Sequence, residues 1–118
     1  MIHTTTTIKT GNSKHEVKVA DNILTRAWGL SLKKEGKMLF KFSRNTSAAI
    51  DMMLLSKPLY LYFANQEKEI IKVEKAEPWN WNPKTWKTYR PKKKYKYLIE
   101  TFEPLELEKE DKFQILND

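Results

Sequence analysis

The residues best suited to bind a ligand gather in one segment, Pro78–Tyr97, which reads PWNWNPKTWKTYRPKKKYKY. The segment contains three of the four tryptophans and three tyrosines, together with seven basic residues and no acidic residue. Indole rings stack on flat groups such as nucleotide bases, and lysine and arginine side chains attract phosphates. The composition therefore predicts a binding site for an anionic or planar ligand, such as single-stranded nucleic acid or a glycan. The candidate ligand-binding residues are Trp79, Trp81, Trp86, Tyr89, Arg90, Lys92, Lys93 and Lys94.

The same segment also has a purely structural interpretation. The loop from Glu77 to about Lys92 is longer than the ~12–15 residues at which a connection without secondary structure becomes uncommon in a compact domain. Ordering such a loop costs conformational entropy, which large rings packed on the core offset. Trp79 and Trp81 are two residues apart, so an extended backbone would point both rings to one side. Two functions stay open: a binding module that displays these rings, or a structural or protein-interaction domain in which the loop packs as core.

The positive charge of the chain is concentrated in this segment. The sequence has 22 basic and 15 acidic residues, so removing the seven basic residues of Pro78–Tyr97 leaves equal numbers of each. The next segment, Ile99–Asp118, reverses the sign with seven acidic residues and two lysines. A concentrated basic segment predicts nucleic acid or another polyanion as partner, with an affinity that falls as salt rises. The sign reversal adds an acidic protein partner, or weak self-association through the acid-rich stretch Glu100–Asp111 of a second copy.

Residues suited to catalysis or metal binding are few. Asp51 is the one carboxylate inside a strongly apolar stretch, AAIDMMLL, and a buried acid there would act as a general acid. No second acid is placed by the same stretch, and a strand-end or ion-paired role explains a lone aspartate as well. His3 and His15 fall on neighbouring predicted strands without the further ligands that a metal site needs. The sequence therefore favours a protein that is not an enzyme and holds no metal, with an enzyme that uses Asp51 as a buried acid as the remaining alternative.

Composition excludes several classes of site. The chain has no cysteine, which rules out disulfides, thiolate metal sites and cysteine nucleophiles. It has three glycines in total and no nucleotide-binding motif, so no glycine-rich phosphate cradle and no cofactor are expected. The N-terminus lacks the pattern of a signal peptide, and no apolar run reaches ~18 residues. These features predict a cytoplasmic protein without a membrane partner.

Short extended segments must position these residues. The chain is expected to form a single domain, residues 1–118. Asp21, followed by apolar residues at helical spacing, predicts one short helix near residues 21–30. Alternating, β-branched or strongly apolar runs predict strands at 2–10, 15–20, 37–42, 48–55, 59–64, 70–76, 94–102 and 111–116.

This pattern of strands predicts a mainly β fold, a small antiparallel β-sandwich or barrel. The two most apolar segments, 48–55 and 59–64, are expected to be adjacent central strands. In the segment KYKYLI, alternation puts Tyr95, Tyr97 and Ile99 on one face of the sheet.

The order of these segments resembles domain-of-unknown-function family 192. The matching positions are Arg26, Gly29 and Leu30 in an R-x-x-G-L segment, Met38, Leu39 and Phe40 in a G-M-L-F strand, and Met52, Pro58 and Leu59 around a proline-led strand. Lys37 stands where the family has glycine, and Tyr60 stands where it has aspartate; the Lys-Asn pair that often precedes the proline is also missing. The resemblance covers roughly Val17 to Ile115. It implies a compact β-rich domain and no settled activity.

Overall fold

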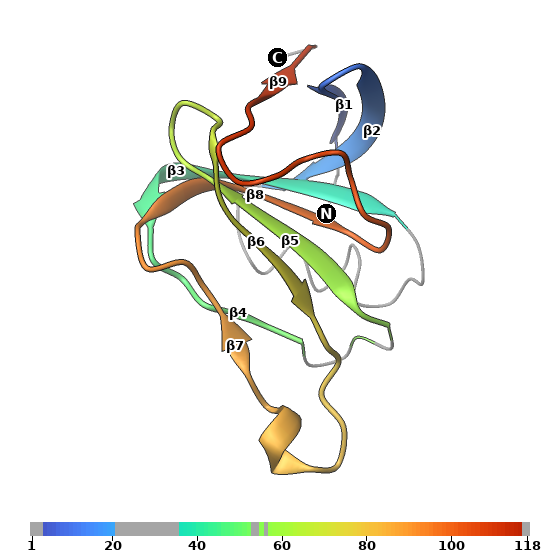
Figure 1. Cartoon of the computed structure of the whole chain (residues 1–118), viewed down its shortest axis with the longest axis vertical. Helices are drawn as coiled ribbons and strands as arrows, with labels where there is room; N and C mark the ends of the chain where they lie inside the picture. The colour runs from blue at the N-terminus through green and yellow to red at the C-terminus, as the bar shows by residue number, and fades with distance from the viewer. Residues whose placement is uncertain (1–3, 21–35, 53–54, 56, 117–118) are drawn as a thin grey trace.

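The three-dimensional structure is a computed structural model that describes residues 4–20, 36–52, 55 and 57–116 (Figure 1). The predicted helix near residues 21–30 lies outside the described residues. Within the described ranges, the one helical element is a short 3-10 turn, η1 (Pro83–Thr85).

Seven strands form one sheet that curls into a half-barrel, which confirms the predicted mainly β fold (Figure 1). In chain order they are β1 (Thr4–Thr10), β2 (Ser13–Ala20), β3 (Lys37–Thr46), β5 (Leu59–Ala64), β6 (Ile70–Ala76), β8 (Tyr95–Thr101) and β9 (Phe113–Ile115). Their spatial order is β6-β5-β8-β3-β2-β1-β9. Neighbours are antiparallel except β2 and β3, which pair in parallel. A parallel pair needs a long connection, and residues 21–36 separate these two strands in the chain.

A separate two-stranded ribbon consists of β4 (Ile50–Asp51) and β7 (Thr88–Tyr89). The prediction that 48–55 is a central strand beside 59–64 is therefore wrong. β5 already has β6 and β8 as its two neighbours, so no edge of it is free for a further strand. The apolar character of 48–55 has another cause: Ile50, Met52 and Leu55 bury their side chains against the face of the sheet.

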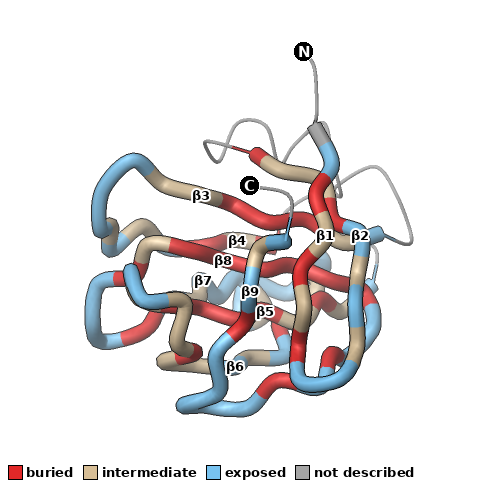
Figure 2. Tube along the Cα trace, turned by 90° about the horizontal axis from the view of Figure 1, so that it is seen from above, coloured by how far each residue is buried: buried red, intermediate tan, exposed pale blue. Residues whose placement is uncertain are grey.

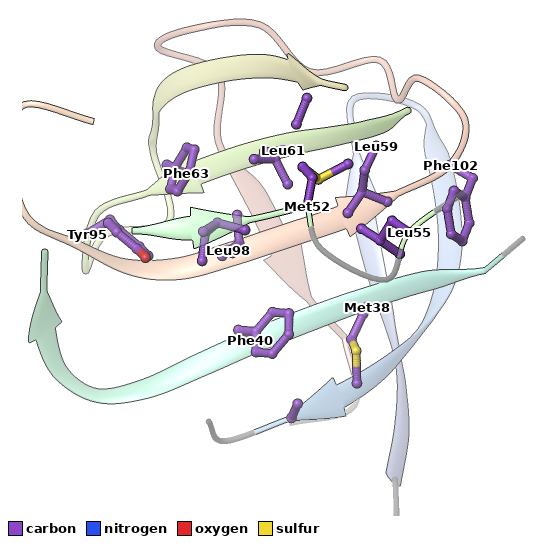
Figure 3. Close-up of a cluster of buried hydrophobic side chains, with 13 residues drawn as sticks. Met38, Phe40, Met52, Leu55, Leu59, Leu61, Phe63, Tyr95, Leu98 and Phe102 are labelled. Carbon is purple, nitrogen blue, oxygen red and sulfur yellow. The ribbon is translucent and has the colours of Figure 1, made fainter. Parts of the chain in front are cut away.

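The central strands bury apolar side chains on both faces. In β5, Leu61 and Phe63 belong to one buried cluster, which we call the first core, whereas Tyr62 belongs to the opposite one, the second core. Figure 3 shows the first core between β3, β5 and β8. Figure 2 shows long buried stretches in these strands, as expected for a sheet covered on both sides.

The predicted common face of Tyr95, Tyr97 and Ile99 is wrong. Tyr95 packs in the first core, whereas Tyr97 and Ile99 pack in the second. The register between β3 and β8 shifts between the pairs Lys41↔Tyr97 and Thr46↔Tyr95. The alternation of side chains in β8 therefore breaks where its pairing with β3 becomes irregular, which a strictly alternating pattern does not predict.

The C-terminal segment joins the two edges of the half-barrel. β9 pairs with β1 at one edge (Figure 2), and the residues before β9 bond to the first residue of β6 at the other. Ile70 donates its N–H to the carbonyl of Asp111 and accepts a bond from the N–H of Glu110, both at 2.7 Å. Farther back, the buried hydroxyl of Tyr62 accepts a bond from the N–H of Leu105 at 2.7 Å. These bonds hold the segment across the second core.

Candidate functional site

The tryptophan-rich segment projects from the half-barrel as a long loop between β6 and β7 (Figure 1). The loop reaches its far end at η1 and returns along the β4–β7 ribbon. We call residues 79–87 the tryptophan tip. The ribbon lies between the tip and the half-barrel, so the sequence folds here into a distinct protrusion.

Three short polar side chains fix the backbone of the tryptophan tip. Asn82 caps η1, since its Oδ1 accepts a bond from the N–H of Lys84 at 3.0 Å, and Pro83 takes a position where its missing N–H has no effect. The Oδ1 of Asn80 accepts a bond from the N–H of Asn82 at 2.7 Å. The Oγ1 of Thr85 accepts a bond from the N–H of Asn80 at 2.9 Å and donates to the carbonyl of Asn82 at 2.8 Å. Hydrogen bonds within the tip therefore hold its backbone in one defined conformation.

Trp79 and Trp86 form a stacked pair that ties the two arms of the tip together. Their ring centroids lie 6.1 Å apart, with an angle of 27° between the ring planes. The Nε1–H of Trp79 donates to the carbonyl of Lys87, and that of Trp86 donates to the carbonyl of Asn80, both at 2.8 Å. Trp79 also packs against the first core. These two rings anchor the tip, although 54% of Trp86 is still exposed.

Trp81 is the displayed ring of the tip, since 98% of its surface is exposed. The prediction that Trp79 and Trp81 point to one side is wrong, because Trp79 folds onto Trp86 and the first core. The loop thus combines the two uses that the sequence left open. Trp79 serves the structure, and Trp81 faces solvent.

Tyr89 and Arg90 hold the base of the loop. The hydroxyl of Tyr89 accepts a bond from the N–H of Glu77 at 3.2 Å, and its ring packs against the first core. The guanidinium of Arg90 donates to the carbonyl of Ser47 at 3.3 Å. Both contacts connect the arms of the loop to the body of the domain.

The lysines of the segment lie in different parts of the structure. Lys84 and Lys87 are exposed residues of the tip itself. Lys92 and Lys93 follow β7 and line a groove of about 890 Å³ beside β6. Lys94 is exposed just before β8. The sequence-based list of candidate residues did not include Lys84 and Lys87. The available signal was their closeness in the sequence to Trp81 and Trp86.

Of the residues considered for chemistry, the structure describes Asp51 and His15, which lie on different strands, β4 and β2. Asp51 is half-buried and pairs with Thr88 in the β4–β7 ribbon. His3 lies outside the described residues. His15 is half-buried; burial lowers the pKa of its imidazole, and the positive charge of Lys37 lowers it further, against an opposing effect of Glu106. Across residues 4–20, 36–52, 55 and 57–116, no three histidine or acidic side chains gather as a metal would require.

Glu100 is a buried carboxyl that the sequence reasoning placed in an exposed acidic stretch. It is completely buried on β8, opposite Met38 of β3 and Leu61 of β5. Burial raises the pKa of the nearby Tyr95 hydroxyl to about 12, and the charge of Glu100 adds to the effect. The exposed part of the acidic stretch therefore begins at Glu103. The apolar neighbours of Glu100 in KYLIETF were the available signal.

Comparison with known proteins places the chain in a family. A family model described as Uncharacterized ACR, domain-of-unknown-function family 192, matches residues 4–115. A UPF0127 protein of Pyrococcus abyssi is 32% identical over 88 residues, which cover 72% of this chain and 69% of that protein.

Two crystal structures share the fold. A proposed transcription regulator from Sinorhizobium meliloti 1021 has a TM-score of 0.76 at 18% identity and covers 98% of this chain and 96% of its own. A protein of unknown function from Novosphingobium aromaticivorans DSM 12444 has a TM-score of 0.69 at 16% identity, with 95% and 84% covered. In the described part of the chain, no helix has the length and apolarity needed to cross a membrane. The curled β-sheet and the match to nearly the whole sequence lead to one conclusion: the chain belongs to domain-of-unknown-function family 192.

Proposed function

We propose that this protein is a non-catalytic binding module whose tryptophan tip takes up single-stranded nucleic acid. The observation that supports the proposal most directly is the 98% exposure of Trp81 on a backbone fixed by hydrogen bonds. Large aromatic rings usually lie at least partly within the protein, because exposing them forfeits the free energy of burial. A displayed ring on a rigid support is the arrangement that base stacking uses.

Preorganisation strengthens the proposal. A flexible loop would lose conformational entropy on binding, which lowers affinity. Here the bonds of Asn80, Asn82 and Thr85 and the ring pair of Trp79 and Trp86 order the tip during folding. The binding step then orders few protein groups other than the side chains that touch the ligand.

Charge favours a polyanion over a neutral ligand. Lys84 and Lys87 are exposed within the tip, and no acidic residue occurs between Pro78 and Tyr97. Phosphates next to a stacked base would be attracted by these lysines. Added salt weakens this attraction, so the affinity would fall as the salt concentration rises. A glycan would use the ring of Trp81 and gain little from the lysines, so it is the second ligand to test.

Titration of the protein with a fluorescently labelled oligonucleotide at low salt tests the proposal. Replacing Trp81 by alanine removes one stack of about 1–3 kcal/mol, so we expect the dissociation constant to rise about 5- to 150-fold. Trp81→Phe keeps a smaller ring and should retain part of the affinity, which serves as the matched control. Unchanged affinity in Trp81→Ala would contradict the proposal. Binding of a neutral glycan with no binding of DNA or RNA would assign the tip to sugars instead.

A further inference from the structure

β6 stands at the end of the seven-stranded sheet, and no strand of the described residues covers most of its outer edge. Its first residue, Ile70, bonds outward to Glu110 and Asp111. The chain then leaves this edge at a turn in which the N–H of Asp111 donates to the carbonyl of Glu108, and Glu110 adopts a positive φ of 80°. In the described part of the chain, no strand pairs with the outer edge of β6 beyond this point.

A groove of about 890 Å³ lies beside the open edge. Ile70–Val73 of β6 line it, with Pro91–Lys93 and Leu107–Glu110 also contributing. Its volume is within the range of functional ligand sites. Val73 is 38% exposed, and Tyr62 lies opposite it in the register of β5 and β6. The groove thus exposes an apolar residue on a strand edge whose backbone groups can accept a further strand.

We propose that this edge binds a second copy of the chain, with β6 pairing antiparallel to β6 and Val73 facing Val73 on the two-fold axis. The charge pattern of the strand supports this partner and this register. Lys72 would lie opposite Glu74 of the second copy, and Glu74 opposite its Lys72. Within one chain these two side chains form an ion pair at 3.1 Å and remain 39% and 30% exposed. Pairing two copies therefore joins two ion pairs into a ring of alternating charges.

The Val73-centred register is favoured over the two adjacent registers, because each of those places like charges opposite each other. Centring the pair on Lys72 would set two lysines opposite each other, and centring it on Glu74 would set two glutamates opposite each other. Like charges at opposite positions destabilise an antiparallel pair. Lysines on an edge strand usually prevent such pairing. Here the glutamate two residues along makes the edge complementary to itself, as a two-fold interface requires.

Lys75 adds a further contact to the same arrangement. In the Val73-centred register, Lys75 of the second copy lies opposite Ile71. Ile71 is adjacent to Ile70, whose carbonyl accepts a hydrogen bond from the N–H of Glu110. Glu108 and Glu110 are both exposed and both line the groove. The second copy would thus bring a positive charge toward two negative ones.

This interface uses the edge of β6 and not the tryptophan tip, so either proposal can fail without the other. Sedimentation at low salt, with chain concentrations up to about 1 mM, measures the dimer directly. Two single charge reversals supply the test, Lys72→Glu and Glu74→Lys. Each turns two attractive cross-strand pairs into two repulsive ones, so we expect each to weaken the dimer by at least tenfold. Lys14→Glu, an equal charge change at an exposed position of β2, should leave the dimer intact.

Mixing the two variants gives the decisive result. A Lys72→Glu chain carries two glutamates at the paired positions, and a Glu74→Lys chain carries two lysines. The mixture should therefore form heterodimers, although each variant alone is monomeric, and this recovery also shows that both variants fold. A monomeric wild-type chain would overturn the proposal. So would single variants that dimerise like the wild type, or variants that dissociate and do not pair when mixed.

Discussion

Replacing Thr85 by valine removes the hydrogen-bonding centre of the tryptophan tip and keeps nearly the same shape. The Thr85 hydroxyl accepts a bond from the N–H of Asn80 at 2.9 Å and donates to the carbonyl of Asn82 at 2.8 Å. Two such bonds contribute about 0.5–1.5 kcal/mol each, or about 1–3 kcal/mol of local ordering. Since only ordered tips bind with full affinity, the dissociation constant for an oligonucleotide should rise by up to about 150-fold.

Thr85→Val should leave global stability almost unchanged, because the lost bonds lie outside both cores. Anisotropy of a labelled oligonucleotide measures the affinity, and amide hydrogen exchange of residues 80–86 measures the order of the tip. Thr88→Val, the same substitution at an exposed position of β7, is the matched control. Faster exchange in the Thr85→Val tip with unchanged affinity would refute the role of preorganisation. Unchanged exchange would refute the role of Thr85 as its centre.

Three further expectations concern the fold. Tyr62→Phe leaves the buried N–H of Leu105 without its partner at 2.7 Å, so the free energy of unfolding should fall by about 1–3 kcal/mol; an unchanged urea midpoint would contradict this. The hydroxyl of Tyr95 has a pKa raised from 10.0 to about 12, so between these values the unfolded chain holds fewer protons than the folded one. Stability should therefore decline by about 2 kcal/mol as pH rises from 10 to 12, and Tyr95→Phe should lose this part of the decline in alkaline unfolding experiments. Gly11 has a positive φ of 61° and open space where a Cβ would stand, so Gly11→Ala should cost about 1–2 kcal/mol and Gly11→Asn less; equal thermal stability of the two variants would argue against a conformational origin.

The mainly β fold was predictable from the sequence because alternation is a local property. Met38, Leu39 and Phe40 lie in the predicted strand 37–42, and β3 buries Met38 and Phe40 in the first core and Leu39 in the second. Pairing was less predictable. The apolar stretch 48–55 has the composition of a central strand, but the neighbours of β5 are decided by residues far away in the sequence.

The candidate site was predictable as a segment but not as a geometry. The composition of Pro78–Tyr97 identified the segment that contains the tryptophans of the tip and the residues at the base of the loop. The turn made by Asn80, Asn82 and Thr85 then decided which ring is displayed, because it brings Trp79 against Trp86 and leaves Trp81 outside. Alternation assumes an extended chain and fails at such a turn. The division of the lysines between the tip and the groove of β6 is likewise a result of tertiary structure.

The indole N–H resonances of the tryptophans, followed by NMR during titration with a short single-stranded oligonucleotide, test the central claim most directly. The signal of Trp81 should shift most, because its ring is the one displayed. Those of Trp79 and Trp86 should shift less, because both N–H groups donate to backbone carbonyls within the tip. The shifts should diminish as salt is added. A Trp81 signal that stays in place while the oligonucleotide binds elsewhere, or while it does not bind at all, would contradict the proposed function.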